Sequence, residues 1–375
     1  DPSYYGQIIE GLAKENRICK VAYDDNLDVE TYWDLGLNDS TSIWFAQRYK
    51  GEIRLIFMDE SSRSLSKELA GLGGENFLSC SDLNLEQIKC LFELSSQFKN
   101  NLRRIDLGNR VLGLVFSKAS TRTRVSFQVA MARLGGQTVD LNPQVSQLGR
   151  GEPIKDTARV LSRYCDVLAI RTFSQQELEE YAEWSTIPVI NALTDLEHPC
   201  QALADYLTIQ EKFGKLEGIN LSYIGDGNNV ANSLMICGAL LGVNVKICSP
   251  NGFEADPKMV EKAKSLSELG SKISISNDPS IAVKEAQVIY TDVWASMGQE
   301  EEKLKRKEIF EKYKVNQKLI GLADEEVIIL HCLPAHRGEE ITDETIESKN
   351  SNVFEQAENR LHVQQALLAA QLGGL

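Results

Sequence analysis

Long hydrophobic runs are missing from this sequence of 375 residues. Its longest apolar stretches, such as residues 234–243, fall short of the roughly 20 residues that a helix needs to span a bilayer. The first residues have neither the basic segment and apolar core of a secretion signal nor the arginine content of a transit peptide. The sequence therefore predicts a cytoplasmic protein without a membrane partner.

Cysteine pairs at metal-binding spacing are missing as well. The eight cysteines are scattered and no two of them form a CxxC motif, which argues against a structural zinc site. In a chain of this length without a secretion signal, such cysteines are expected to be reduced thiols in the cytosol. We therefore expect no bound metal.

Basic residues are in the minority, with 40 Lys and Arg against 54 Asp and Glu and a net charge of −14. This balance disfavours general binding to nucleic acids or to anionic membranes. It still allows a local cationic pocket for a small anion. A composition that is 42% hydrophobic and 25% charged is typical of a globular protein, and the length allows two or three domains.

Residues 1–20 contain a short helical pattern, and residues 29–58 predict β structure. Strands are expected at residues 29–33, 42–48 and 52–58, with Lys50-Gly51 as the turn of a hairpin. Residues 61–74 are polar and rich in glycine, which indicates a boundary or linker.

Beyond this linker, short apolar strands alternate with helices. Residues 82–94 form the pattern of a capped amphipathic helix, and further helices are expected at residues 121–134, 200–213 and 230–241. Continuous apolar strands between helices are typical of parallel sheets, hence of an α/β fold. Because about 300 residues are too many for one sheet, we expect two doubly wound lobes. The expected strands are residues 111–116, 167–170, 189–191, 220–224, 243–248, 288–291 and 327–330.

An anion site is predicted where the strand at residues 111–116 leads into the next helix. The connecting segment contains Ser120-Thr121-Arg122-Thr123-Arg124. A helix N-terminus presents unpaired N–H groups and the positive end of the helix dipole. Hydroxyl and guanidinium groups add donors that phosphate oxygens accept. An N-cap serine with solvent-facing arginines is the alternative from this segment alone.

Two further polar segments lie between strands and helices. His198-Pro199 stands where open α/β sheets place ligands, and His198 could donate a hydrogen bond, bind a metal or be structural. No further metal ligands occur at fitting spacing. The segment from Gly225 to Asn229 is similar to a dinucleotide loop, but Val230 replaces the third glycine, so NAD binding is only weakly supported. Its asparagines could instead bind a carboxylate or an amine.

The last polar segments are residues 292–298, His331-Cys332-Leu333-Pro334 and residues 356–360. The first two follow strands directly, so the strand ends should converge on one crevice. Neighbours in an extended segment point to opposite faces, which argues against a nucleophile pair of Cys332 and His331, although His198 could reach Cys332. Arg360 would add a phosphate ligand.

Together these segments resemble the transcarbamylase family, the aspartate and ornithine carbamoyltransferases, over residues 76–375 and in the family's order. The resemblance implies a carbamoyl-phosphate domain at residues 76–205, an ornithine-binding domain at 206–345, and a C-terminal helix at 346–375 that returns to the first domain. It also implies a homotrimer with active sites at subunit interfaces. The implied reaction moves the carbamoyl group of carbamoyl phosphate to the δ-amine of L-ornithine, which gives citrulline for arginine biosynthesis, without a metal or organic cofactor.

The resemblance also assigns roles to individual residues. The implied catalytic residues are Arg122, Arg171, His198 and Cys332. The implied carbamoyl-phosphate ligands are Ser120, Thr121, Arg122, Thr123, Gln147 (from the neighbouring subunit), Arg171, His198, Gln201, Cys332, Leu333 and Arg360. The implied ornithine ligands are Asn229, Asp292, Ser296 and Met297. The loop at residues 296–298 favours ornithine over aspartate or putrescine, and the Leu333–Pro334 peptide is expected to be cis.

The chemistry of these side chains agrees with the implied roles. Arginines at a helix N-terminus would bind the phosphate and stabilise charge on the leaving group. Thr123, Arg171 and His198 can donate to the carbamoyl oxygen as a tetrahedral intermediate forms. Asp292 would orient the α-amino group of ornithine and Asn229 would bind its carboxylate. Much of the rate would then come from positioning two substrates.

Residues 1–65 do not fit this family. Residues 29–60 resemble the start of the RNase H-like nuclease domain of phage terminase large subunits, in which Asp34 would bind metal. The other acids of that site would lie on later strands, where this chain becomes a transferase, and one carboxylate cannot hold two metals. We therefore expect residues 1–65 to come from a gene fusion or an assembly artefact, followed by a linker at residues 66–75.

Three classes of function follow from these observations. The first is a carbamoyltransferase for ornithine, or for another amine such as putrescine or N-acetylornithine. The second is a phage DNA-packaging nuclease fragment that uses residues 1–65. The third is a catalytically silent binding protein on the same fold, against which the intact set of Arg122, Arg171, His198 and Cys332 argues.

Overall fold

The computed structural model describes residues 29–35, 41–49, 52–59, 67–142, 151–295 and 303–374. The chain divides into two compact units, Asp1–Leu69 and Ala70–Leu375. None of the helices within the described ranges is long and apolar enough to cross a membrane.

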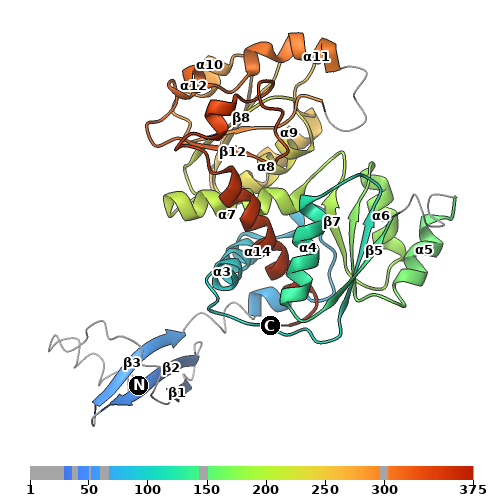
Figure 1. Cartoon of the computed structure of the whole chain (residues 1–375), viewed down its shortest axis with the longest axis vertical. Helices are drawn as coiled ribbons and strands as arrows, with labels where there is room; N and C mark the ends of the chain where they lie inside the picture. Colours follow the sequence, from blue (N-terminus) through green and yellow to red (C-terminus); the bar gives the residue numbers. More distant parts are fainter. Residues whose placement is uncertain are drawn as a thin grey trace. The chain divides into compact units, whose positions relative to one another are not determined.

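The first unit contains a three-stranded antiparallel sheet in the order β1-β2-β3 (Figure 1). Its strands are β1 (Val29–Leu35), β2 (Thr41–Tyr49) and β3 (Glu52–Asp59). The pairing of Tyr49 with Glu52 makes β2 and β3 a hairpin. The helical pattern of residues 1–20 and the turn predicted at Lys50 and Gly51 lie outside the described residues.

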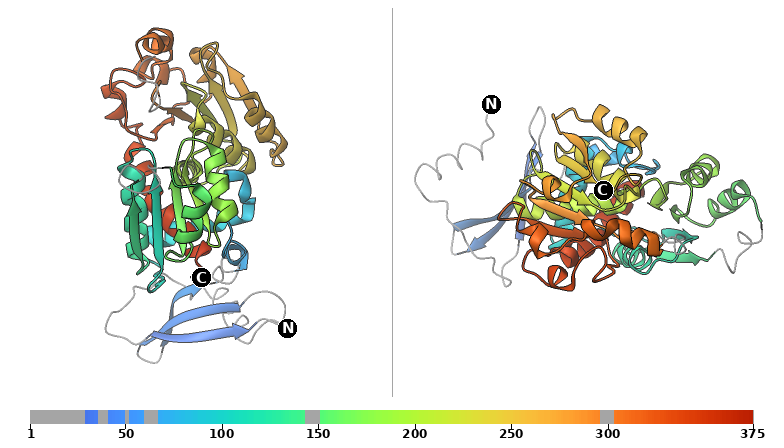
Figure 2. Two further views of the ribbon diagram at one scale, coloured as in Figure 1. Left: turned by 90° about the vertical axis from the view of Figure 1, so that its right-hand side faces the viewer. Right: turned by 90° about the horizontal axis from the view of Figure 1, so that it is seen from above.

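The second unit is α/β, as predicted, and it holds two parallel sheets with helices on both sides (Figures 1 and 2). The first sheet has the order β5-β4-β6-β7, and all its neighbouring strands are parallel. Its strands are β4 (Val111–Phe116), β5 (Gln137–Leu141), β6 (Val167–Arg171) and β7 (Val189–Leu193). The helices of this part of the chain are η1 (Cys80–Asp82), α3 (Leu85–Lys99), α4 (Arg122–Arg133), α5 (Ile154–Leu161), α6 (Gln175–Trp184) and α7 (Pro199–Phe213).

The second sheet has the order β10-β9-β8-β11-β12 and is also parallel throughout. Its strands are β8 (Asn220–Ile224), β9 (Asn244–Cys248), β10 (Ile273–Ser276), β11 (Val288–Thr291) and β12 (Ile328–His331). The helices that accompany it are α8 (Asn229–Leu240), α9 (Pro257–Ser265), α10 (Pro279–Ala282), α11 (Lys303–Phe310), η5 (Glu311–Tyr313), α12 (Gln317–Ile320) and α13 (Asp343–Ile346).

The last helix, α14 (Val353–Gln371), leaves the second sheet and packs among α3, α4 and α7 of the first lobe (Figure 1). It is buried along almost its whole length, although it carries several amides and a guanidinium group. Polar side chains of α14 are therefore held inside the protein, where each needs a partner.

Each sheet has one point at which the strand order reverses. In the first sheet this point lies between β4 and β6, and in the second it lies between β8 and β11. Open α/β sheets bind ligands outside the carboxyl ends of the strands at such a point. Polar motifs found in the sequence follow β4, β8 and β11 at these two points, and the segments of His198 and Cys332 follow the neighbouring strands β7 and β12.

Candidate active site

The first candidate side chains lie where β4 leads into α4. Thr121 is the N-cap residue of α4, and its side chain makes no cap hydrogen bond. The structure therefore differs from the simple N-cap serine that the sequence allowed as an alternative. Arg122 begins the helix and is partly exposed, whereas Thr123 is buried. The positive end of the helix thus presents amides that the N-cap side chain leaves uncapped, next to a guanidinium group and a hydroxyl group.

Two arginines lie near this helix end, the buried Arg360 and the half-buried Arg171. Arg360 of α14 donates from Nη2 to Oγ1 of Thr123 over 2.7 Å. Burial and then the charge of Arg360 lower the pKa of Arg171, at the end of β6, to about 10, and Arg122 contributes in the same direction. Burial also lowers the pKa of Arg360. The Nε atoms of Arg171 and Arg360 are buried and have no hydrogen-bond partner among the described residues.

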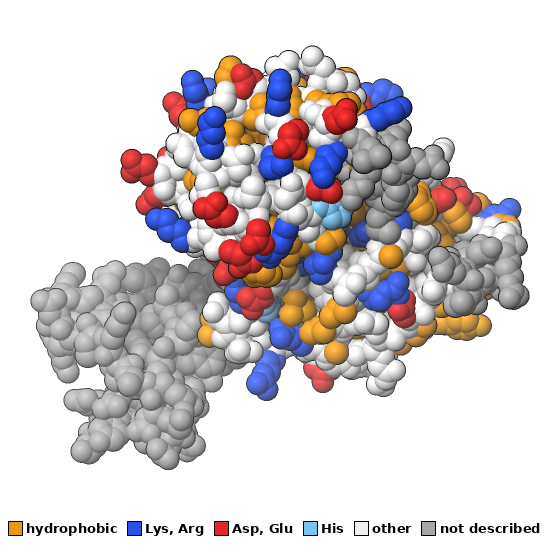
Figure 3. Space-filling model, turned by 45° about the horizontal axis from the view of Figure 1, so that its top comes forward, with side chains coloured by type: hydrophobic (Ala, Val, Ile, Leu, Met, Phe, Trp, Pro, Cys, Tyr) orange, Lys and Arg blue, Asp and Glu red, His pale blue; other side chains and the backbone are white. Residues whose placement is uncertain are grey.

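Three guanidinium groups thus lie within electrostatic reach of one another in a largely buried site. Buried charges of one sign are unfavourable unless an opposite charge joins them. On the face shown in Figure 3, acidic and basic side chains are intermixed. The candidate binding site for an anion is therefore this buried cluster.

His198 is the N-cap residue of α7, and its side chain is 5% exposed. Burial, together with the charges of Arg360 and Arg171, lowers the pKa of its imidazole well below the usual value. The ring is therefore neutral at physiological pH, and it can donate one hydrogen bond without adding charge. Its Nδ1 atom is buried and has no partner within the described part of the chain.

A carboxylate that the sequence reasoning missed lies beneath the arginine cluster. Asp205 of α7 is fully buried, and its Oδ1 accepts hydrogen bonds from Nε2 of Gln201 (2.8 Å) and from Nε2 of Gln356 (2.7 Å). Burial raises its pKa to about 7, against these hydrogen bonds and the charge of Arg360. Asp205 lies in the middle of a helix, so only its spacing of four residues from Gln201 could have indicated a role.

At the second sheet, Asn228 connects a helix cap to an acid. Its Oδ1 accepts the N–H groups of Val230 (3.0 Å) and Ala231 (3.2 Å), and thereby caps α8. Its Nδ2 donates to Oδ2 of Asp292 over 2.8 Å. The next residue, Asn229, donates from its side chain to the carbonyl oxygen of Thr194 over 2.6 Å. The start of α8 therefore holds both Asp292 and the segment before His198.

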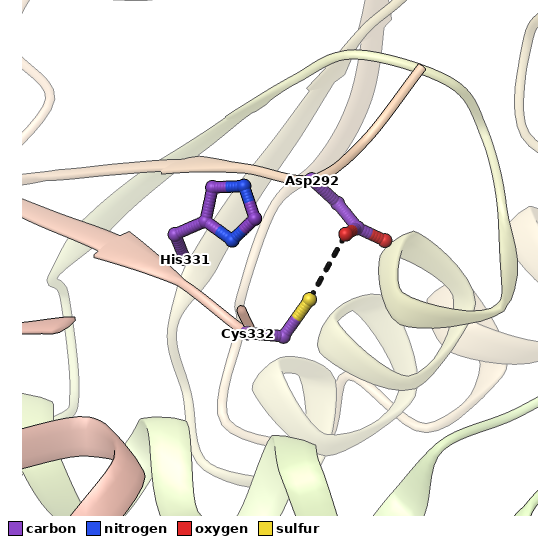
Figure 4. A group of neighbouring side chains, drawn as sticks. All are labelled: Asp292, His331 and Cys332. Carbon is purple, nitrogen blue, oxygen red and sulfur yellow. Dashed lines mark hydrogen bonds between the residues drawn. The ribbon is translucent and has the colours of Figure 1, made fainter. Parts of the chain in front are cut away.

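Cys332 and Asp292 form the pair drawn in Figure 4, in which Sγ donates to Oδ1 of Asp292 over 3.0 Å. Burial, and then the nearby charge of Asp292, raise the pKa of the thiol well above its usual value. Cys332 is therefore a thiol and not a thiolate at physiological pH, which argues against a nucleophilic cysteine.

The prediction that His331 and Cys332 point to opposite faces was wrong. Their side-chain atoms and those of Asp292 lie within 4.8 Å of one another. Strand β12 ends at His331, and Leu333 has a φ of 55°, so the strand does not continue through this segment. The Leu333–Pro334 peptide is cis, as predicted.

His331 is nevertheless not a base for Cys332. Its Nδ1 accepts the N–H of Leu333 (2.8 Å), and its Nε2 lies 3.0 Å from Oε1 of the buried Glu340. Because Nδ1 accepts, Nε2 carries the proton and donates to Glu340. Both ring nitrogens are occupied, so His331 holds the backbone of the loop that follows it.

Two groups of side chains within the described ranges could in principle bind a metal ion: Asp292, His331 and Cys332, and His336, Glu339 and Glu340. In the first group both nitrogens of His331 are already used. In the second group Glu340 already accepts from His331 and from the N–H of His336 (2.6 Å). The absence of a metal from the site stays a prediction.

The two sheets meet at Gln356. Its Oε1 accepts the N–H of His331 over 2.9 Å, while its Nε2 donates to Asp205. Around this point the structure brings together most of the site residues that the sequence predicted. Gln147, Ser296 and Met297 lie outside the described residues. The described residues are Arg122, Thr123, Arg171, His198, Gln201 and Arg360 near the first sheet, and Asn229, Asp292, Cys332 and Leu333 near the second.

Comparison with known proteins gives two family matches. The model described as "Aspartate/ornithine carbamoyltransferase, carbamoyl-P binding domain" matches residues 75–211. The model described as "Aspartate/ornithine carbamoyltransferase, Asp/Orn binding domain" matches residues 217–371.

Individual relatives agree with the family matches. Over 318 residues the chain is 70% identical to the ornithine carbamoyltransferase of a Prochlorococcus marinus strain, which covers 85% of this chain and 100% of the relative. It is 58% identical over 305 residues to that of Trichormus variabilis, covering 81% and 99%. Among solved structures, ornithine carbamoyltransferases from Gloeobacter violaceus and Pyrococcus furiosus are each 50% identical, with TM-scores of 0.74 and 0.78. They cover 80% and 81% of this chain and 99% of their own lengths.

Proposed function

The chain belongs to the aspartate/ornithine carbamoyltransferase family, and from this premise we propose that its site transfers the carbamoyl group of carbamoyl phosphate to the δ-amine of L-ornithine. The products are L-citrulline and phosphate. The observation that carries the proposal is the set of Arg122, Arg171 and Arg360, which bring positive charge into a buried site at the start of α4. A dianionic phosphate is the ligand that this arrangement suits.

The phosphate is bound at the first sheet. The amides and side chains at the start of α4 donate hydrogen bonds to it. Arg171, Arg360, Gln201 and Gln147 of a neighbouring subunit complete the site. Charge grows on the phosphate as the bond to the carbamoyl carbon breaks, so Arg122 and its neighbours act more strongly in the transition state than in the ground state. The residues proposed for this role are Ser120, Thr121, Arg122, Thr123, Gln147, Arg171, Gln201 and Arg360.

The carbamoyl oxygen is polarised by neutral donors and by one arginine. Arg360 connects these residues, because burial and then its charge lower the pKa values of Arg171 and His198, and its Nη2 donates to Thr123. The δ-amine, once it has lost its proton, attacks the carbamoyl carbon, and these donors stabilise the oxyanion of the tetrahedral intermediate. A neutral His198 suits this role because the arginines already supply the positive charge.

Ornithine is bound at the second sheet. Asp292 accepts the α-amino group, Asn229 binds the carboxylate, and Ser296 and Met297 complete the amino-acid site. The hydrogen bonds from Asn228 and Cys332 support this role because they orient the carboxylate of Asp292. Cys332 and Leu333 line the reacting centre between the two substrates.

The family and the surface together support a homotrimer. Val125 and Val129 of α4 and Val139 of the edge strand β5 are 49%, 36% and 44% exposed in the single chain. Val125 and Val129 are one helical turn apart on α4, which packs against β5, and exposed apolar side chains on neighbouring elements are typical of a subunit interface. In such a trimer, the family resemblance implies that each site takes Gln147 from the neighbouring chain.

The remaining assignments follow from the same function. The carbamoyl-phosphate domain spans residues 76–205, the ornithine domain spans 206–345, and residues 346–375 return to the first domain. The enzyme works in the cytoplasm, in the biosynthesis of arginine, without a metal or organic cofactor. Residues 1–65 and the linker at 66–75 take no part in the reaction.

The test is the formation of carbamoylated product from carbamoyl phosphate and each of L-ornithine, putrescine, L-aspartate and N-acetylornithine. Turnover with ornithine alone supports both the reaction and the amine. Turnover with another amine keeps the phosphate site and overturns the choice of ornithine. No product with any of the four amines overturns the proposed function.

A further inference from the structure

A buried carboxylate lies next to His198 in the sequence. The side chain of Glu197 is 1% exposed, yet it is fully engaged in hydrogen bonds. Its Oε1 accepts from the hydroxyl of Ser79 (2.6 Å), and its Oε2 accepts from the N–H of Cys80 (3.3 Å) and the hydroxyl of Ser233 (3.4 Å). Nζ of Lys262 reaches Ser79 over 3.4 Å and brings a positive charge near the cluster. A carboxylate is buried in this way only when several donors compensate its lost hydration.

Ser233 connects this carboxylate to His198. Its Oγ accepts the backbone N–H of His198 over 2.8 Å and donates to Glu197. His198 is an N-cap residue, so its N–H has no partner inside α7. Ser233 lies on α8, beside the second sheet, and it therefore holds the backbone of His198, which follows a strand of the first sheet.

The whole segment before His198 is docked on α8 in the same way. Asn229 donates to the carbonyl oxygen of Thr194 (2.6 Å), and Asn232 donates to that of Leu196 (3.0 Å). With Ser233, three side chains of one helix face hold one short segment. Such an array restricts the position of the segment more than any single bond would.

The ring of His198 depends on this backbone support. A catalytic imidazole is usually oriented by a hydrogen bond to its second nitrogen. Here the Nδ1 atom of His198 has no partner among the described residues, so no such bond holds the ring. Its orientation must come from the packing around it and from the placement of its backbone.

We propose that Glu197 and Ser233 are positioning residues, which hold His198 in place for the donation of its hydrogen bond and join the second lobe to the first at that point. Neither touches a substrate. The inference rests on the proposed function, in which His198 polarises the carbamoyl group.

The first test compares two variants of equal size, Ser233→Thr and Ser233→Val. Both add one carbon-sized group to the buried site, but only threonine keeps the hydroxyl that accepts from His198 and donates to Glu197. We expect the valine variant to lose roughly 10- to 100-fold in kcat, because a displacement of about 1 Å in a catalytic group has an effect of that size. The kcat of the threonine variant should stay within about threefold of the native value. Glu197→Gln should also lower kcat. KM for ornithine should change little in all three variants.

The second test asks whether the effect passes through His198. In a His198→Ala background, Ser233→Val should lower kcat by less than about twofold further, because the group that Ser233 positions is gone. A purely structural role would lower kcat by the same factor in both backgrounds. The control is Ser249→Ala, since Ser249 is also buried and its hydroxyl has no partner within the described residues, and it should leave kcat unchanged.

Three results would overturn the inference while the native enzyme still forms citrulline. They are equal kcat values for the threonine and valine variants, additive losses with His198→Ala, and native kcat in Glu197→Gln. If the native chain forms no carbamoylated product with any amine, the proposed function fails and this inference fails with it. Thermal unfolding of each variant shows whether a loss of kcat comes from misfolding. If Ser233→Val does not fold, the kcat values of Glu197→Gln and Ser233→Thr test the inference.

Discussion

Buried arginines near one another are rare in proteins, because removing a cation from water is unfavourable and a neighbouring cation adds repulsion. Both effects lower the pKa values of Arg171 and Arg360. Each of these residues also has a buried Nε atom without a hydrogen-bond partner among the described residues. At the scale of single residues, this unfavourable arrangement is the clearest indication of a ligand in the described part of the chain. A phosphate would relieve the repulsion and supply the missing acceptors.

Replacing Arg122 tests the anion site directly. We expect Arg122→Ala to lower kcat by about 10²–10³-fold, because its guanidinium group stabilises charge that grows on the leaving phosphate. Steady-state kinetics with ornithine would measure this loss. Arg133→Ala is the matched control, since Arg133 is exposed at the other end of α4 and should leave turnover unchanged. Near-native turnover in Arg122→Ala would refute the role proposed for this residue.

Asp205 makes the stability of the protein depend on pH. Its pKa is raised from 3.8 to about 7 in the folded protein, so the folded state binds the proton more tightly than the unfolded state. The resulting contribution to stability is fully present below pH 4 and is lost as the pH rises to about 7. Relative to Asp205→Asn, the native protein should therefore lose thermal stability between pH 4 and pH 7, with no further change above pH 8.

Thermal unfolding of the two proteins at several pH values would measure this dependence. The hydroxyl of Ser280 lowers the pKa of Asp278. Relative to Asp278→Asn, the native protein should therefore gain thermal stability as the pH rises, which is the opposite of the trend for Asp205. The contribution of Asp278 is present above pH 4 and is lost as the pH falls below that value. A difference between native protein and Asp205→Asn that does not vary with pH would contradict the assignment.

The side chains that could be predicted from the sequence are those that directly follow strands. His198 precedes α7 and Asp292 follows β11, so the rule for strand ends found both, whereas Arg171, at the end of β6, was named only through the family resemblance. Asp205 and Glu340 could not be found in this way, because one lies inside a helix and the other acts through His331. The expected separation of His331 and Cys332 failed because the strand does not continue beyond the end of β12.

At the scale of elements, the sequence reasoning found the inner strands and missed β5 and β10, each at an edge of its sheet. Inner strands are buried on both faces and form continuous apolar runs, as in β4 and β11. Strand β5 is mostly exposed and contains Gln137 and Asp140, and β10 alternates isoleucine with serine. A criterion based on apolar runs cannot recognise such strands.

The cap of α8 should affect both stability and ornithine binding. Asn228→Ala removes the cap, which lowers the stability of the protein by about 1 kcal/mol. It also removes the hydrogen bond to Asp292, so KM for ornithine should rise several-fold more than KM for carbamoyl phosphate. Both constants and the unfolding temperature are the quantities to measure.

The matched control for this prediction is Asn316→Ala. Asn316 caps α12 through the N–H of Leu319, and its hydrogen bonds within the described residues go to α12 and not to the site. It should lower stability by a similar amount and leave both KM values unchanged. If the two variants changed KM for ornithine equally, Asn228 would have no role in holding Asp292.

At the scale of the whole molecule, the unit Ala70–Leu375 contains both family matches and every described residue of the candidate site. We expect a shortened chain that begins at Lys67, and so retains the fully buried Leu69, to keep the turnover and the unfolding temperature of the full chain. Kinetics and thermal unfolding of both chains would measure this. Mg²⁺-dependent cleavage of DNA by the full chain, lost in Asp34→Ala, would contradict the view that residues 1–65 are without function.

The proposed trimer can be tested through the exposed valines. We expect Val129→Asp to lower the mass in solution from three chains to one, because a carboxylate would be buried in the subunit interface. Turnover should fall at the same time, because in the proposed trimer each site would use Gln147 of a neighbour. Sedimentation and kinetics measure the two effects. Leu322→Asp, at a side chain 47% exposed elsewhere, should change neither.

Helix α14 has a consequence for how the enzyme is made in the cell. Both Arg360 and Gln356 lie on this helix, which comes last among the described elements and packs among α3, α4 and α7. Ribosomes deliver the chain from its N-terminus at about 5–20 residues per second, and domains begin to fold as they emerge. The surfaces of α3, α4 and α7 that pack against α14 therefore stay uncovered until this helix is synthesised. A nascent chain cannot consume carbamoyl phosphate before α14 has been synthesised, and a chain that stops before residue 353 would stay inactive however well its earlier parts had folded.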